Sequence, residues 1–219
     1  MSRILSPELT HKVMSATDAA TFINHGDNVG MSGFTGAGFP KAVPQALANR
    51  IRDAHSAGDE FSIGMFTGAS TSAEVDGALA EVDGVHLRTP FNTDPDMRKA
   101  INDGRVEYMD QHLSHLAQQM WFGFYGNLDV AVIEVVAILP NGLLVPGTSV
   151  GNNKTWLDLA DKVILEVNEW LPTQFEGMHD VYYGTRIPPH RNPIQILSPD
   201  QRIGCLLYTS PSPRDATLS

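Results

Sequence analysis

The sequence has little of several features that would identify a class of function. It contains one cysteine, Cys205, so an intramolecular disulfide is excluded and a reducing compartment is favoured. Positive charge is also scarce, because 15 Lys and Arg stand against 25 Asp and Glu and the formal net charge is −10. Phosphate backbones are bound by basic surfaces, so a chain this acidic is a poor general binder of nucleic acid. Anionic metabolites are not excluded.

Long apolar runs are missing as well. The N-terminal stretch has neither the apolar segment of a secretory signal nor the arginine content of a transit peptide; it reads MSRILSPELTHKVMS. No run reaches the length that spans a bilayer. We therefore expect a cytoplasmic protein.

Common catalytic signatures are absent too. No Gly-x-Ser-x-Gly turn is present to anchor a serine hydrolase. His112 and His115 are spaced to share a helix face, but no third ligand stands at a recognisable spacing, so we expect no metal site. Cys205 borders a segment of unusual composition and is discounted as a nucleophile.

What the 219 residues do contain is a regular alternation of strand-like and helix-like segments. Apolar runs alternate with helical patterns about seven times, and the later apolar runs are rich in Val and Ile. The strand-like apolar runs include residues 28–33, 61–68, 85–89, 128–138 and 162–167. Such runs are typical of parallel strands buried on both faces. The sequence predicts an α/β fold: an open, mostly parallel, twisted sheet with helices on both faces.

Local signals refine this expectation. Ser6-Pro7-Glu8 is a good helix start, with a capping hydroxyl followed by proline and an acidic residue in the first turn. Asp94 is a suitable N-cap for a short helix in DPDMRKAINDG. Asn141-Gly142 predicts the turn of a hairpin.

The regular pattern ends near residue 170. We interpret residues 1–170 as one α/β domain and residues 171–204, which are rich in proline, as an arm or linker toward another domain. Residues 205–219 change to a Ser/Pro/Thr composition that resembles translated sequencing adapter. We expect this tail not to be native protein.

The richest motif is VGMSGFTGAGFP at residues 29–40, whose central part, Gly33–Gly38, we call the glycine loop. Its order, Gly33-x-x-Gly36-x-Gly38, matches neither the dinucleotide fingerprint nor the P-loop. The loop could offer backbone N–H groups to an anion or a carbonyl oxygen. It could equally be a tight turn packed beneath another loop.

Two further loops are expected at the same edge of the sheet, after the strands at 61–68 and 85–89. In parallel sheets ligands bind outside the carboxyl ends of the strands, so these three loops predict the ligand-facing side. Glu134 interrupts the apolar run VAVIEVVAI. A carboxylate in a buried strand needs a partner or a chemical task, and we expect a partner on a neighbouring helix or on the backbone.

Several segments together carry a family likeness: VGMSGFTGAGFPKAVPQALA, TPFNTD, DVAVIEVVAI, TSVGNNKTWLDLADKVILEVN and EGMHDVYYGT. Over residues 5–204 the chain resembles the N-terminal part of the acetyl-CoA hydrolase/transferase family. The resemblance implies two similar open α/β domains with an active site in the cleft between them. It also implies transfer of CoA between a short-chain acyl-CoA, such as acetyl- or succinyl-CoA, and a carboxylate through a glutamyl-CoA thioester.

In that family the nucleophilic glutamate and the CoA-binding segments lie in the second domain, and no glutamate here matches the nucleophile's motif. The resemblance therefore implies no catalytic residue and no activity in this chain alone. The substrate-binding residues that can be carried over are Gly33, Thr35, Gly36, Gly38, Asn92 and Thr93. Coenzyme A is expected as a substrate and not as a cofactor. The partners implied are acyl-CoA, short carboxylates and, for the full-length enzyme, a second copy in a homodimer.

Two other functions remain open from the residues alone. One is an enzyme similar to a sugar-phosphate isomerase on a related open α/β fold, which would need a base and a phosphate site in this chain. The other is a non-catalytic ligand-binding module, which would be stable without an exposed apolar interface.

Overall fold

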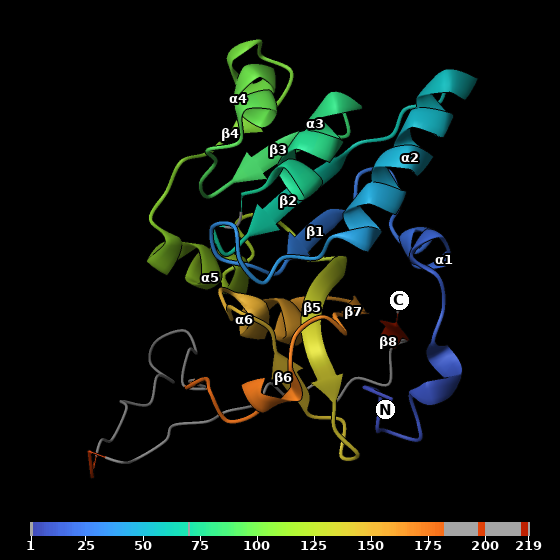
Figure 1. The fold of residues 1–219 in the computed structure, drawn as a ribbon. Coiled ribbons are helices and arrows are strands. Elements are labelled where there is room, and N and C mark those ends of the chain that lie inside the picture. The colour runs from blue at the N-terminus through green and yellow to red at the C-terminus, as the bar shows by residue number, and fades with distance from the viewer. Residues whose placement is uncertain (1, 70, 182–196, 200–215, 219) are drawn as a thin grey trace.

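The computed structural model describes residues 2–69, 71–181, 197–199 and 216–218. It contains one sheet whose strand order is β4-β3-β2-β1-β5-β7-β8, with β6 paired to β5 (Figure 1). The strands are β1 (Asn28–Met31), β2 (Ile63–Thr67), β3 (Val85–Thr89), β4 (Glu107–Tyr108), β5 (Val130–Ile138), β6 (Leu144–Pro146), β7 (Lys162–Val167) and β8 (Ala216–Leu218). Every pairing is parallel except the β5–β6 hairpin.

Helices cover both faces of this sheet. They are α1 (Ala16–Ala20), α2 (Ala42–Ala57), α3 (Ala78–Glu81), α4 (Pro95–Asn102), α5 (Leu113–Trp121) and α6 (Asn153–Leu159), with 3-10 turns η1 (Thr10–Lys12) and η3 (Thr173–Phe175) and a π-helical turn η2 (Ala73–Gly77). The longest, α2, has 16 residues. Among the described residues no helix combines the length and apolar character that a membrane span requires.

The core is divided by the sheet into two layers. Helices α1 to α4 pack on one face around residues such as Leu47, Leu79 and Met97, whereas α5 and α6 pack on the other face around Leu116 and Trp156. Because side chains alternate along a strand, β5 contributes to both layers, with Val130 and Val132 in the first and Ala131 and Ile133 in the second. The predicted α/β fold with an open, mostly parallel sheet and helices on both faces is confirmed.

The predicted turn signals were mostly right, with one error. Asp94 caps α4 by accepting hydrogen bonds from two backbone N–H groups, and Gly142 forms the hairpin turn with a φ of 80°. The helix expected from Ser6-Pro7-Glu8 is wrong, because this segment forms turns followed by η1. The chain just before it pairs with the end of β5, where Leu5 donates to the Ile138 carbonyl oxygen. This pairing and the burial of Ser6 outweigh the local preference for a helix.

The segment after residue 170 begins by packing onto the domain. Leu171 and Phe175 contact the apolar cluster beneath β5 and β6, and His179 Nε2 lies 2.6 Å from the Gly147 carbonyl oxygen. Val181 is buried. Residues 182–196 of the expected arm, 200–204 at its end and 205–215 of the expected tail lie outside the described residues, so the division at 170 and 205 stays a prediction.

Candidate functional site

Three loops at the carboxyl ends of β1, β2 and β3 are joined by hydrogen bonds. Thr35 N–H donates to the Ala69 carbonyl oxygen at 2.9 Å, and Thr71 N–H donates to the Thr35 carbonyl oxygen at 3.1 Å. The Thr71 hydroxyl oxygen accepts from the N–H groups of Thr93 and Asp94 at 3.3 and 3.0 Å. The three loops therefore form one continuous surface at the sheet edge where α/β proteins bind ligands.

Two residues in these loops hold a backbone conformation that is unusual for a side chain other than glycine. Thr35 has a φ of 50° and Ala69 a φ of 63°, both in the left-handed region. Each costs on the order of 1–3 kcal/mol, and such strain is concentrated at functional sites. Because Thr35 and Ala69 are hydrogen-bonded to each other, the strain lies where the first two loops meet.

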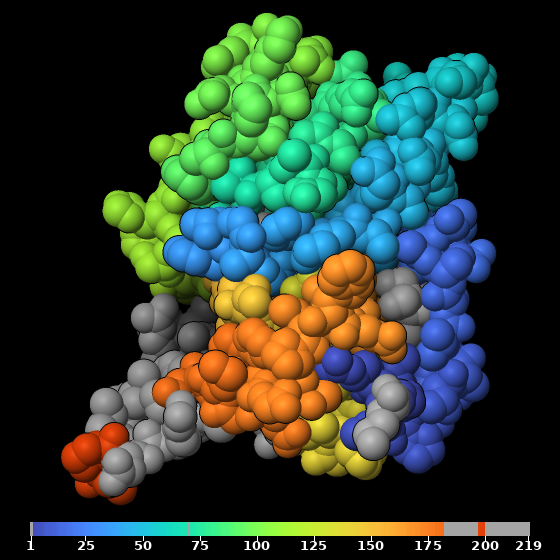
Figure 2. Space-filling model, in the orientation of Figure 1, coloured from blue at the N-terminus to red at the C-terminus, as the bar shows by residue number. Residues whose placement is uncertain are grey.

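The glycine loop presents only part of itself to the surface. Thr35 and Gly36 are exposed, and a Cβ placed on Gly36 would meet no atom within 4 Å. Gly33 and Gly38 are buried, with φ values of 119° and 67°. In Figure 2 the loop, in blue, crosses the surface between the cyan elements and the orange segment that follows β7.

In the third loop, too, only one of the two predicted residues is exposed. The half-buried Asn92 side chain is engaged in the loop's own turn, where its Nδ2 donates to the Asp94 carbonyl oxygen at 3.2 Å and its Oδ1 accepts from Asp94 N–H at 3.3 Å. Thr93 is exposed, and its hydroxyl bonds the Thr71 hydroxyl at 3.3 Å. Of the six predicted residues, the structure brings Thr35, Gly36 and Thr93 together on the outer surface of the joined loops.

Glycines at the base of the loops allow backbones to approach closely. A Cβ on Gly68 would lie 2.8 Å from the Gly33 carbonyl oxygen and 2.8 Å from the Asn152 nitrogen. A Cβ on Gly151 would lie 2.6 Å from the same Gly33 oxygen. Gly33 therefore packs between the end of β2 and the segment that enters α6. At Gly33 the structure therefore has the alternative left open by the sequence, a turn packed against other loops.

This packing can be tested with Gly68→Ala. We expect the substitution to lower the free energy of unfolding by about 1–3 kcal/mol, because backbone atoms cannot move away from the added methyl group. Urea unfolding measures the effect. The matched control is Gly36→Ala, because a Cβ at residue 36 has open space around it. Its free energy of unfolding should stay within about 1 kcal/mol of the parent's. Equal stability of the two variants would contradict the proposed contact between loops.

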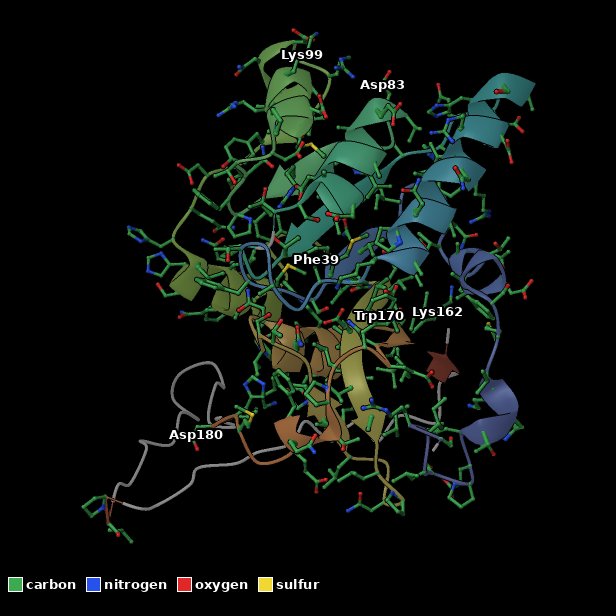
Figure 3. The ribbon with its side chains drawn as sticks, viewed as in Figure 1. Phe39, Asp83, Lys99, Lys162, Trp170 and Asp180 are labelled. Carbon is green, nitrogen blue, oxygen red and sulfur yellow. The ribbon has the colours of Figure 1, made fainter. Side chains whose placement is uncertain are left out.

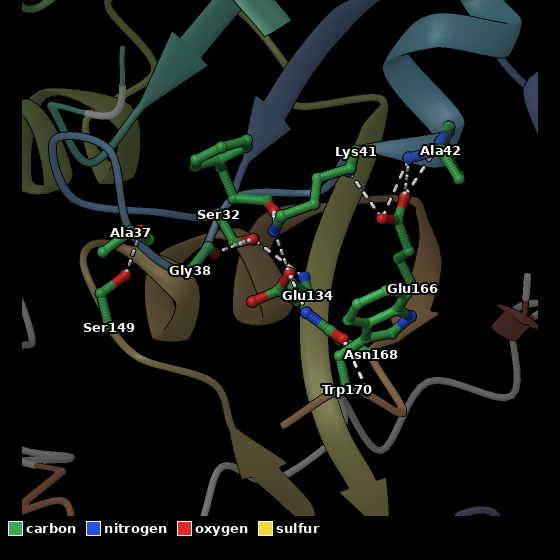
Figure 4. A network of polar contacts seen from close by, with 12 residues as sticks. Ser32, Ala37, Gly38, Lys41, Ala42, Glu134, Ser149, Glu166, Asn168 and Trp170 are labelled. Carbon is green, nitrogen blue, oxygen red and sulfur yellow. Dashed lines mark hydrogen bonds and ion pairs between the residues drawn. The ribbon is translucent and has the colours of Figure 1, made fainter. Parts of the chain in front are cut away.

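Glu134 has the partners that its burial demands. Its side chain is 1% exposed, and its Oε2 accepts from Lys41 Nζ at 2.5 Å and from Asn168 Nδ2 at 3.0 Å (Figure 4). Lys41 Nζ also donates to the Phe39 carbonyl oxygen at 2.7 Å and lies 4.3 Å from the centre of the Phe39 ring. In Figure 3 Phe39 lies near the middle of the view, below Asp83 and Lys99 and above Asp180. The expectation of a partner for this buried carboxylate is confirmed.

Glu166 was missed by sequence reasoning and caps helix α2. Its carboxylate accepts from the backbone N–H groups of Lys41, Ala42 and Val43, at distances between 2.6 and 3.1 Å. The next residue is Pro44, which has no N–H, so the donors at the start of α2 are satisfied by one side chain. A second glutamate near the end of an apolar run, in KVILEV, was the signal that could have found it.

A buried ion pair supports the second and third loops from beneath. Arg88 and Asp76 are both fully buried, and Arg88 Nε donates to Asp76 Oδ1 at 2.8 Å. Asp76 Oδ2 also accepts from Ser72 N–H at 3.1 Å, and Arg88 Nη1 donates to the Thr89 carbonyl oxygen at 2.6 Å. Burial raises the pKa of the Asp76 carboxyl, against the opposing effects of Arg88 and the Ser72 amide. The pair links the segment after Ser72 to the end of β3.

The two histidines considered for a metal lie beside each other at the start of α5, with ring centres 5.6 Å apart. Within the part of the chain that the structure describes, no group of three or more His, Cys, Asp or Glu is arranged to hold a metal ion.

Comparison with known proteins identifies the family of this chain. The model of the acetyl-CoA hydrolase/transferase N-terminal domain matches residues 3–186. The chain belongs to this family, the one that its motifs resemble.

Curated relatives carry names of two activities. The chain is 42% identical to the succinyl-CoA:acetate CoA-transferase of Clostridium kluyveri over 207 residues, covering 94% of this chain and 38% of that protein. It is 42% identical to the propanoyl-CoA:succinate CoA transferase of Escherichia coli, covering 87% of this chain and 39% of that protein. It is 39% identical to the acetyl-CoA hydrolase of Schizosaccharomyces pombe, covering 93% of this chain and 40% of that protein. The chain spans about two-fifths of the length of these relatives.

Solved structures agree on the fold. RipA from Yersinia pestis matches with a TM-score of 0.59 at 19% identity, over 74% of this chain and 38% of that one. Glutaconate coenzyme A-transferase from Acidaminococcus fermentans matches with a TM-score of 0.56 at 16% identity, over 71% of this chain and 66% of that one.

Proposed function

We propose that this chain is the first part of an enzyme that moves CoA between a short-chain acyl-CoA, acetyl- or succinyl-CoA, and a carboxylate. The observation that carries the proposal is the Gly36 N–H. It has no hydrogen-bond partner among the described residues; Gly36 is exposed, and a Cβ placed on it would meet no atom within 4 Å. A free backbone donor on a pre-formed, strained loop suits a substrate oxygen that gains negative charge during acyl transfer.

The chemistry proposed for the complete enzyme runs through a glutamate that lies outside this chain. Its carboxylate attacks the thioester carbonyl carbon, the C–S bond breaks, and an acyl-glutamyl anhydride and CoA thiolate result. The thiolate then attacks the glutamyl carbonyl, which releases the first carboxylate and leaves a glutamyl-CoA thioester. The acceptor carboxylate regenerates the glutamate by the reverse two steps, so no cofactor is consumed and CoA is a substrate.

In this proposal the joined loops form one wall of the cleft. The Gly36 N–H and the hydroxyl groups of Thr35 and Thr93 face the acyl group or the attacking carboxylate. Gly33, Gly38 and Asn92 act behind them: the glycines allow the loop's path and Asn92 holds the turn that exposes Thr93. Exclusion of water by the other wall decides between transfer and hydrolysis, the two activities that the relatives' names carry. The complete enzyme is proposed to act as a cytoplasmic homodimer.

The test compares the chain with the natural gene expressed over its complete reading frame. Each protein is incubated with succinyl-CoA and acetate, and acetyl-CoA is measured by chromatography. We expect acetyl-CoA from the complete protein and none above background from residues 1–219. Transfer by residues 1–219 alone would contradict the location of the nucleophile, and no turnover of any acyl-CoA by the complete protein would contradict the function.

A further inference from the structure

We propose that Lys41 and Glu134 are positioning residues that hold the glycine loop in its ligand-binding form. The importance of the loop rests on the proposed function, whereas the geometry of the pair stands on its own contacts. Neither residue belongs to the predicted site residues. The Glu134 side chain is buried, whereas 46% of the Lys41 side chain is exposed.

Both ends of the glycine loop are tied to residue 134. On the entering side, Glu134 N–H donates to the Ser32 hydroxyl oxygen at 2.8 Å, and this hydroxyl donates to the Gly38 carbonyl oxygen at 2.9 Å. On the leaving side, Lys41 Nζ bonds both the Phe39 carbonyl oxygen and Glu134 Oε2. The chain before the loop and the chain after it therefore converge on one residue of β5 (Figure 4).

Lys41 also joins two carboxylates that lie side by side. Glu134 and Glu166 are paired in register on the parallel strands β5 and β7. Lys41 donates its Nζ to Glu134 at 2.5 Å and its backbone N–H to Glu166 at 2.6 Å. Because both carboxylates are more than nine-tenths buried, each needs donors of its own, and Lys41 supplies one to each.

The position of the Glu134 carboxylate is further restricted by its neighbours. A Cβ on Gly147 would lie 2.7 Å from Oε1, so a larger residue there would displace this oxygen. Asn168 Nδ2 donates to the other oxygen, Oε2. Because the carboxylate is confined on both sides, it fixes the position of the Lys41 ammonium that binds it. The same ammonium donates to the Phe39 carbonyl oxygen, so the carboxylate also fixes the chain just after the glycine loop.

Amide hydrogen exchange of residues 1–219 tests this role without a substrate. Three loop amides are hydrogen-bonded and so report on loop opening: Phe34 to Ala37, Ala37 to Phe34 and Thr35 to Ala69. We expect Lys41→Met and Glu134→Gln each to speed their exchange by about 10- to 100-fold, the fold-change that loss of a hydrogen bond to a charged group produces. Exchange of the central β5 amides should stay unchanged.

The controls separate local from global effects. Lys99→Met removes a surface pair with Asp103 and should leave loop exchange unchanged, and Lys41→Arg should restore most of the protection. Unchanged loop exchange in Lys41→Met, or an equal increase at the β5 amides, would overturn the positioning role. If Lys41→Met does not fold, Glu134→Gln, which keeps the shape of the side chain, decides by the same criteria.

In the complete enzyme, Lys41→Met should lower kcat/KM by at least tenfold and Lys41→Arg should recover most of it, whereas Lys99→Met should not change it. Faster loop exchange together with a complete protein that turns over no acyl-CoA would refute the proposed function and leave the positioning role standing. Slow loop exchange in Lys41→Met, with an active complete enzyme, would refute the positioning role alone.

Discussion

Replacing Arg88 by methionine is expected to lower the free energy of unfolding by about 3–5 kcal/mol. The substitution keeps most of the side-chain volume but leaves the Asp76 carboxylate fully buried without its cation. Such an isolated charge costs far more than the intact pair contributes. Chemical denaturation of Arg88→Met at neutral pH measures the loss, and the exchange of the Thr71 and Thr93 amides should rise with it.

The stability of Arg88→Met is expected to depend on pH. Burial already raises the pKa of Asp76 above its ordinary value of 3.8, and without Arg88 the carboxyl will take up a proton more readily. The folded variant then binds more protons than the unfolded chain, so its stability falls as pH rises above 3.8. We expect the deficit to shrink as the pH is lowered toward this value. A deficit under 1 kcal/mol at neutral pH, equal to that of the surface variant Lys99→Met, would contradict the role of the pair.

Trp156→Ala is the second substitution with a large expected effect, a loss of about 3–5 kcal/mol in the free energy of unfolding. Trp156 is fully buried where α6 crosses β1, and a Cβ on Gly30 would lie 2.9 Å from its ring. Its Nε1 donates to the Met31 carbonyl oxygen at 3.2 Å. Because Gly30 has no side chain that could fill the space, the ring's removal leaves a cavity.

Two further variants serve as comparisons for the stability loss expected in Trp156→Ala. Trp156→Phe keeps much of the ring volume and loses the hydrogen bond, so it should cost about 1–3 kcal/mol. Trp170 is 97% exposed, and Trp170→Ala should change stability by less than about 0.5 kcal/mol. If Trp156→Ala were as stable as Trp170→Ala, the packing of α6 on β1 described here would be wrong.

The fold could be predicted because its signals are local. The apolar run of β5, the Asn141-Gly142 turn and the Asp94 cap each act over a few residues, and each formed as expected. The helix start at Ser6 failed because its competitor is distant in sequence: the preceding residues pair with Ile138 at the end of β5. A preference of a few tenths of a kcal/mol per residue cannot outweigh such pairing.

The candidate site, too, could be predicted from the sequence only in part. Clustered glycines left open both a ligand-facing loop and a packed turn, and the close approach of Gly33 to Gly68 and Gly151 shows that this part of the loop is packed. A charged residue in a buried strand indicated a partner for Glu134, but the sequence could not name Lys41, 93 residues away. The capping of α2 by Glu166 spans 125 residues and has no signal near Lys41 itself. Such partners become visible only when the strand order is known.

The exposed part of the glycine loop is proposed to form one wall of an acyl-transfer cleft. The most direct measurement is kcat/KM for CoA transfer from succinyl-CoA to acetate by Gly36→Leu in the complete enzyme. Because Gly36 has open space beyond it, the side chain should leave thermal stability unchanged and should obstruct only what binds there. We predict a loss on the order of 100-fold, against no loss for Ala57→Leu at the exposed end of α2. A stable Gly36→Leu enzyme with the parent's kcat/KM would contradict the claim.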